Sequence, residues 1–106
     1  MLTKGEAKKL VEEIINRPDP SIPNFPELVI LDEATIERAF GWVFFYQTRE
    51  YAETEDIETI LVGNAPYIVN KNDGSLHETG TAYPIEHYID MYERTGSPHG
   101  CPDPNN

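Results

Sequence analysis

The chain has 106 residues, 39% of them hydrophobic, which is enough for one domain with a modest core. No run approaches the roughly 18 apolar residues that cross a bilayer, so no membrane span is predicted. The net charge is -11, and no basic stripe with interleaved aromatic residues is visible, which argues against nucleic acid as a partner.

The charge is unevenly distributed along the chain. Residues 1–17 hold four of the eight basic residues against three of the 19 acidic ones, a sum of about +1. Residues 18–106 therefore carry four basic and 16 acidic side chains, a sum of about -12. A region this acidic attracts a basic protein and speeds the encounter with it. The alternative is that the acidity only keeps a small protein soluble.

The first residues, MLTKGEAKKLVEEIINR, lack the uninterrupted apolar stretch and the cleavage site of a signal peptide. The single cysteine, Cys101, permits no internal disulfide, which agrees with a reducing compartment. The sequence therefore predicts a cytoplasmic location.

Residues 2–16 predict an amphipathic helix. Thr3 can cap it, and Glu6 three residues later completes a capping box. The apolar stripe at helical spacing consists of Leu10, Val11, Ile14 and Ile15. The next ten residues, RPDPSIPNFP, hold four prolines and predict a connecting loop, because no helix or central strand tolerates that density.

Extended structure is predicted next. Residues 27–32, ELVILD, are apolar and β-branched, as in a strand. Residues 33–40, EATIERAF, fit either a strand or a short helix; extended structure is favoured because a hairpin into the following strand is the simplest connection. Residues 41–50, GWVFFYQTRE, predict a central strand, because both of its faces are apolar at its start.

Alternation divides this strand into two faces. One face carries Trp42, Phe44 and Tyr46, and the other carries Val43, Phe45 and Gln47. Phe44 and Phe45 are assigned to the interior. For Tyr46, Tyr51 and Tyr67 two interpretations stay open, core packing and anchoring a protein partner, since tyrosine is enriched at binding hot spots.

An acidic interval separates this strand from the next. Residues 51–58, YAETEDIE, predict a loop or a helical turn. Pro66 cannot donate to a sheet ladder, so the GNAP sequence marks an edge entry or a bulge before a strand at residues 67–70.

The C-terminal part begins with a hairpin. Asn-Asp-Gly at residues 72–74 predicts a tight turn into a strand at residues 76–78. Residues 84–94 predict a helix with Pro84 in its first turn and apolar residues at spacings of three and four.

These elements predict an α+β fold: a small antiparallel sheet of about four strands, with an N-terminal and a C-terminal helix packed on one face of it. Residues 1–95 are expected to form this single domain. Residues 96–106 are expected to be a flexible, proline-rich tail.

The sequence offers little catalytic or metal-binding chemistry. Cys101 and His99 lie two residues apart in the tail, which cannot hold a fixed nucleophile–base pair and supplies only two of the four ligands of a structural zinc site. His77 and His87 fit surface or boundary positions. The run NKNDGSLHE resembles a calcium loop in part, but a hairpin turn explains it better. No catalytic residue, metal ligand or cofactor is predicted.

The motifs nevertheless resemble a known family. They are a Gly-Trp-x-Phe strand, a Gly-Asn-x-Pro turn, an Asp-Gly hairpin and a Gly-Thr pair before the last helix. Their residues are Gly41, Trp42, Phe44, Gly63, Asn64, Pro66, Asp73, Gly74, Gly80 and Thr81. In order and spacing, over about half of the chain, they resemble the immunity protein 35 family, also called the YrhB domain. The resemblance implies a small α+β protein that binds and neutralises a polymorphic bacterial toxin in the producing cell, without enzymatic activity.

The first hypothesis is therefore an immunity protein whose acidic side chains pair with a basic toxin surface. The residues expected to bind the toxin are Tyr46, Glu50, Tyr51, Glu53, Glu55, Asp56 and Glu58. A stress-related, chaperone-like protein that binds unfolded clients is the alternative, and a small enzyme that uses acids on the sheet face is a third. The enzyme hypothesis requires a concave pocket with convergent carboxylates.

Overall fold

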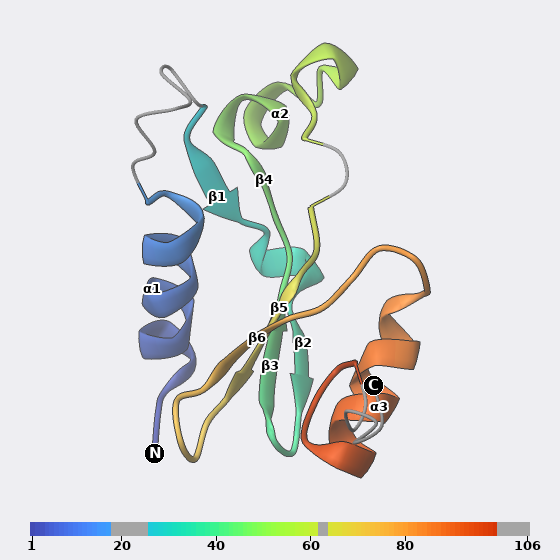
Figure 1. The fold of residues 1–106 in the computed structure, drawn as a ribbon. Coiled ribbons are helices and arrows are strands. Elements are labelled where there is room, and N and C mark those ends of the chain that lie inside the picture. Colours follow the sequence, from blue (N-terminus) through green and yellow to red (C-terminus); the bar gives the residue numbers. More distant parts are fainter. Residues whose placement is uncertain (18–25, 62–63, 100–106) are drawn as a thin grey trace.

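A computed structural model describes residues 1–17, 26–61 and 64–99 (Figure 1). The elements are α1 (Lys4–Ile15), β1 (Leu28–Ile30), the 3-10 helix η1 (Asp32–Ala34), β2 (Ile36–Arg38), β3 (Gly41–Phe44), β4 (Tyr46–Thr48), α2 (Arg49–Thr54), the 3-10 helix η2 (Ile57–Thr59), β5 (Tyr67–Asn70), β6 (Leu76–Glu78) and α3 (Ile85–Thr95). They confirm the predicted α+β class.

The strands form two antiparallel sheets. Four strands pair in the order β2-β3-β5-β6, and β1 pairs with β4 in a separate two-stranded sheet. The β2–β3 pair confirms the predicted hairpin into residue 41. The 3-10 helix η1 takes up Asp32, the last residue of the strand predicted at 27–32, and Glu33 and Ala34, the first two residues of the ambiguous stretch. The β5–β6 hairpin confirms the turn predicted at Asn72-Asp73-Gly74.

The single strand predicted at residues 41–50 is wrong in two respects. The chain leaves one sheet after Phe44 and enters the other at Tyr46, with the Phe45 carbonyl accepting a 2.8 Å bond from the Leu31 amide. The strand then ends at Thr48, whose hydroxyl accepts a 3.0 Å bond from the Tyr51 amide and caps α2. Because Thr48 caps a helix, residues 49 and 50, the predicted end of the strand, are helical instead.

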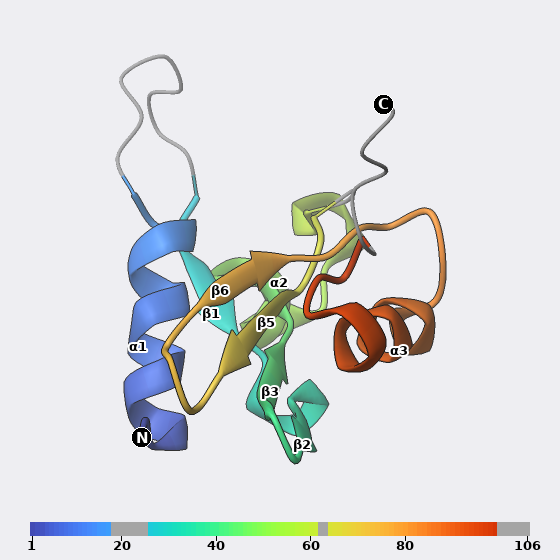
Figure 2. The same ribbon diagram turned by 60° about the horizontal axis from the view of Figure 1, so that its bottom comes forward.

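The two long helices cover opposite faces of the four-stranded sheet, as Figures 1 and 2 show. Ala7 and Val11 of α1 pack with Trp42 and Phe44, whereas Ile89 and Tyr92 of α3 pack with Val43 and Ile68 in a second cluster. The expectation that both helices share one face is therefore wrong. Neighbouring side chains along a strand point to opposite faces, and β3 is apolar on both faces. Each face must therefore be covered by a separate helix.

The helix ends follow the sequence signals. Thr3 and Glu6 form the predicted capping box, with bonds of 2.9 and 3.2 Å. Pro84 is the N-cap of α3 and thus lies just before the first turn. Within the described ranges, no helix is long and apolar enough to cross a membrane.

Some predictions lie wholly or partly outside the described residues. They concern most of the proline-rich loop (18–25), Gly63 of the GNAP turn, and Cys101 with the rest of the tail. The tail's described start contacts the domain: Pro98 is buried, and His99 Nε2 lies 2.9 Å from the Glu78 carbonyl oxygen.

Tyr67 gives a prediction for alkaline pH. Burial, with a 3.1 Å hydrogen bond to Glu78, raises the pKa of Tyr67 to about 12. An unfolded tyrosine loses its proton near pH 10. The stability that this group contributes is therefore fully present below pH 10 and is lost as the pH rises from 10 to 12.

We expect the denaturant midpoint to fall less steeply between pH 10 and 12 in Tyr67→Phe than in the unaltered protein. Tyr83→Phe, at an exposed tyrosine, is the control and should retain the parent slope. Denaturant unfolding at several pH values measures both. Equal slopes for Tyr67→Phe and the parent would contradict the role given to Tyr67.

Candidate functional site

The acidic residues predicted to bind a partner lie together at one end of the molecule. Residues 49–59, from α2 to η2, are called here the acidic segment, and Figure 1 shows this segment projecting beyond the sheets. Five exposed carboxylates belong to it: Glu50, Glu53, Glu55, Asp56 and Glu58. Its one basic residue, Arg49, is paired with Glu27 and lies 3.8 Å from Glu53. The segment is therefore a concentrated negative surface.

Side chains of β4 hold the acidic segment in place. The buried amide of Gln47 donates to the Leu61 carbonyl at 2.6 Å and accepts from the Leu61 amide at 2.8 Å. Next to it, the buried Thr48 hydroxyl donates to the Thr59 carbonyl at 2.8 Å. These bonds satisfy backbone groups at the end of η2 and in the chain that follows it, so they fix the position of the acidic segment against β4.

Local bonds also order the acidic segment internally. Asp56 caps η2 by accepting from the Glu58 amide at 3.0 Å, and its own carbonyl accepts from the Thr59 hydroxyl at 2.7 Å. Glu55 ends α2 in the left-handed conformation, with φ at 58°. A non-glycine residue in this region costs about 1 kcal/mol, which the surrounding bonds offset. The carboxylates therefore sit on an ordered backbone.

The seven residues predicted to bind a partner divide into two groups. The five carboxylates and the half-buried Tyr51 all belong to the acidic segment. Tyr46 instead packs in the core, is 9% exposed and stacks at 6.1 Å from Tyr67. It therefore offers little surface to a partner. Partner binding by the other six residues stays a prediction.

Ile57 is an exposed apolar residue that the sequence analysis did not single out. It begins η2 in the middle of the acidic segment, and 77% of its surface is exposed. The signal in the sequence was an apolar residue directly between two acidic ones, Asp56 and Glu58. A partner that covers the acidic segment would remove this aliphatic side chain from water.

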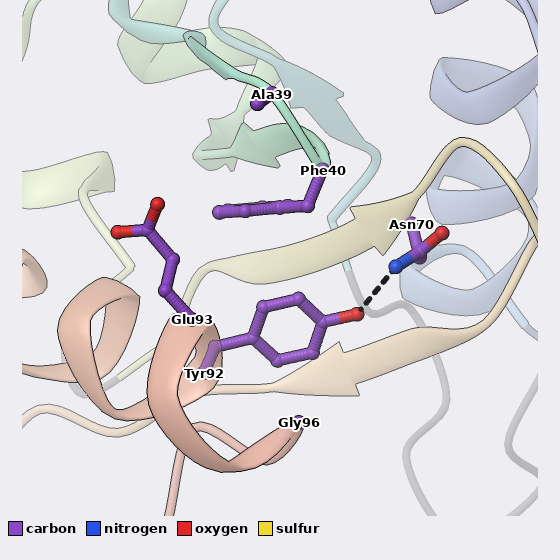
Figure 3. A pocket seen from close by; sticks show the side chains of 6 residues that line it. All are labelled: Ala39, Phe40, Asn70, Tyr92, Glu93 and Gly96. Atoms are coloured by element: carbon purple, nitrogen blue, oxygen red, sulfur yellow. Dashed lines mark hydrogen bonds between the residues drawn. The ribbon is translucent and has the colours of Figure 1, made fainter.

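A second feature is a hollow beside the end of α3, which Figure 3 shows from close by. We call it the α3 hollow. Its volume is about 370 Å³, and its lining consists of Ala39, Phe40, Asn70, Tyr92, Glu93 and Gly96. Inside it the Phe40 and Tyr92 rings meet edge to face at 4.9 Å, and the Asn70 amide donates to the Tyr92 hydroxyl at 2.9 Å.

Asp73, Ser75 and His77 are the residue types of a catalytic triad, but their hydrogen bonds do not connect them in the order that a triad requires. His77 Nε2 lies 2.9 Å from Ser75 Oγ, and Ser75 Oγ donates to Asp73 at 2.7 Å. A nucleophilic serine must direct its proton at the histidine, whereas here it directs it at the carboxylate. The same bond, together with the Ser75 amide, lowers the pKa of Asp73. These contacts shape the β5–β6 turn.

The α3 hollow does not hold the convergent carboxylates that the enzyme hypothesis requires. The α3 hollow has one carboxylate in its lining, Glu93, rather than a convergent pair. Over residues 1–17, 26–61 and 64–99, no three histidine, cysteine or acidic side chains are grouped so that they could hold a metal ion.

Comparison with known proteins gives the family. The family model described as Immunity protein 35 matches residues 5–91. A protein of Escherichia coli strain K12, named Uncharacterized protein YrhB, is 44% identical over 62 residues, which are 58% of this chain and 66% of the relative. The match thus spans just under two-thirds of that relative. No solved structure matches. Since the family model matches most of the chain, this protein belongs to the immunity protein 35 family.

Proposed function

We propose that this protein neutralises a cognate bacterial toxin by direct, stoichiometric binding in the cytoplasm of the producing cell. The observation that carries the proposal is the family match over residues 5–91. The acidic segment supports it, because its five carboxylates are exposed on an ordered backbone. Binding covers a surface that the toxin needs, so no catalysis by this protein is required.

The acidic segment is suited to a basic toxin surface. Opposite charges steer the two proteins together and speed their encounter. Exposed ion pairs add little affinity individually, so a desolvated apolar contact must supply most of the remaining binding free energy. Ile57 provides such a contact at the centre of the charged surface. The expected partner surface is an apolar depression rimmed by lysine or arginine.

The chaperone-like alternative requires a contiguous exposed apolar patch for unfolded clients. The large exposed hydrophobic residues in the described part of the chain are Met1, Ile57 and Tyr83. They belong to the N-terminus, η2 and the segment before α3, which are three separate parts of the fold (Figure 1). This distribution favours binding to one specific partner.

Co-expression with the products of neighbouring genes tests the proposed function. A cognate toxin should co-purify at a 1:1 ratio by light scattering, and the protein should restore growth of cells that express the toxin. If no neighbouring product binds or is neutralised, while the protein suppresses the aggregation of unrelated clients, the chaperone-like alternative replaces the proposal.

Ile57→Ser should weaken toxin binding by roughly 10- to 100-fold. Fully burying an isoleucine side chain contributes about 1.5–3 kcal/mol, and this contribution is lost in the variant. Calorimetric titration measures the affinity. Because Ile57 is 77% exposed in the free protein, the melting temperature should stay within about 2 °C of the parent value.

Tyr83→Ser provides the matched control for Ile57→Ser. Tyr83 is a large residue that is 59% exposed and lies outside the acidic segment. Its replacement should leave the affinity within about twofold of the parent value. An unchanged affinity in Ile57→Ser would remove η2 from the interface.

A further inference from the structure

We propose that the α3 hollow receives the guanidinium group of an arginine that the toxin presents, as a second anchor apart from the acidic segment. This inference rests on the proposed function. The hollow holds about 370 Å³, at the low end of the range of roughly 300–1,000 Å³ for small-ligand pockets. That size suits one long side chain and excludes a helix or a strand.

The aromatic part of the hollow favours a flat cation. The ring of the half-buried Phe40 meets that of Tyr92 at an interplanar angle of 67°, with centroids 4.9 Å apart. The Tyr92 ring is buried and also packs against His77, with centroids 5.0 Å apart, so Phe40 is the ring that a ligand can reach. The face of an aromatic ring carries partial negative charge and attracts a cation within about 6 Å, and arginine stacks on such faces more readily than lysine. Figure 3 shows the Phe40 ring extending into the hollow, with the Glu93 side chain beside it.

Glu93 supplies the formal charge. Its carboxylate is exposed at the rim and has neither a salt bridge nor a hydrogen bond to any side chain within the described ranges. The neighbouring Arg94 pairs with Asp90 at 3.1 Å, and Arg38, next to Ala39, donates to the Glu37 carbonyl at 3.1 Å. A carboxylate beside an aromatic face is a geometry that arginine can satisfy through both charge and stacking.

The end of α3 adds to the negative potential. The helix spans Ile85–Thr95 and ends at Gly96, a lining residue of the hollow, with φ at 81°. The C-terminus of a helix carries a partial negative charge and favours cations. A Cβ at Gly96 would meet no atom within 4 Å, so the approach on this side is open.

The remaining polar groups of the hollow do not favour an anion. One amide hydrogen of Asn70 is donated to the Tyr92 hydroxyl, and the Asn70 side-chain oxygen accepts from the Asn72 amide at 2.8 Å. The Asn70 side chain therefore links Tyr92 to the β5–β6 turn. The Phe40 ring, the Glu93 carboxylate and the helix end all select a cation.

A titration of the isolated, isotope-labelled protein tests this inference without the toxin. N-acetyl-arginine amide, added at physiological salt, should shift the backbone NMR signals of Ala39, Phe40, Asn70 and Gly96 and saturate at millimolar concentration. N-acetyl-citrulline amide has nearly the same shape without the charge, and it should produce no such shifts. Glu93→Gln should weaken arginine binding about fivefold, the upper range for an exposed ion pair.

Glu86→Gln is the matched control, because Glu86 is an exposed carboxylate on the same helix and does not line the hollow. It should leave arginine binding unchanged. Shifts spread over all acidic residues, an equal response to citrulline, or equal effects of the two variants would overturn the inference. If the toxin complex forms but the titration fails, only this inference is lost. If the titration succeeds but no toxin binds, the proposed function is lost instead.

Discussion

Gly41→Ala is expected to lower the free energy of unfolding by about 4 kcal/mol, most of the total stability of a small domain. Gly41 begins β3 with φ at 150°, and a Cβ there would overlap the backbone carbonyl oxygen of Val69. In the same position, the Cβ would lie 3.0 Å from the Lys71 amide nitrogen. Both are backbone atoms, one in β5 and one in the residue that follows it, so only a shift of the sheet could relieve the overlap.

The melting temperature of Gly41→Ala should fall by roughly 20 °C. Gly96→Ala is the control, because Gly96 also has a positive φ, at 81°, but a Cβ there meets nothing within 4 Å. Its cost should be limited to the backbone conformation, about 1 kcal/mol. Thermal unfolding followed by circular dichroism measures both. If the two alanine variants melted at the same temperature, the close approach of Gly41 to β5 would be refuted.

Neutralising four carboxylates of the acidic segment should weaken toxin binding by roughly 10- to 100-fold. The variant is Glu53→Gln, Glu55→Gln, Asp56→Asn and Glu58→Gln. Each lost pair contributes about 0.2–1 kcal/mol, and the effect should appear mainly as a slower association rate that depends less on salt. Asparagine at position 56 retains the oxygen that accepts from the Glu58 amide, so η2 keeps its cap.

The matched control removes four exposed carboxylates elsewhere: Glu13, Glu33, Glu37 and Glu86, each replaced by glutamine. Both variants change the net charge by +4. Stopped-flow association at several salt concentrations should show a small effect for the control and a large one for the acidic-segment variant. Equal slowing in both would mean that the overall charge of the protein, rather than the acidic segment, steers the toxin.

Much of the fold could be predicted because its signals are local. Thr3 with Glu6 caps α1, Asn72-Asp73-Gly74 closes a hairpin, and each signal involves residues within three or four positions. The break in the strand at Phe45 could not be predicted in the same way. It depends on the bond from the Leu31 amide to the Phe45 carbonyl, which extends the β1–β4 pairing between two separate segments of the chain, and no local pattern encodes that pairing.

The candidate site likewise has features that the sequence predicted and features that it did not. The run of acidic residues between the strands gave the location of the acidic segment, because charge is a property of the sequence itself. The burial of Tyr46 and the exposure of Ile57 were not predicted, since an aromatic or aliphatic residue in a mixed segment fits either environment. Tyr46 packs because β4 lies against the core, and Ile57 projects because Gln47 and Thr48 hold the segment outward.

By itself, the sequence determined the fold class, most element positions, the acidic surface and the family resemblance. Only the tertiary structure decided that α1 and α3 cover opposite faces and that the α3 hollow forms between residues of β5, α3 and the β2–β3 turn. The physical reason is the range of the interactions. Caps, turns and alternation act between near neighbours, whereas face selection and cavities arise from contacts between segments far apart in the chain.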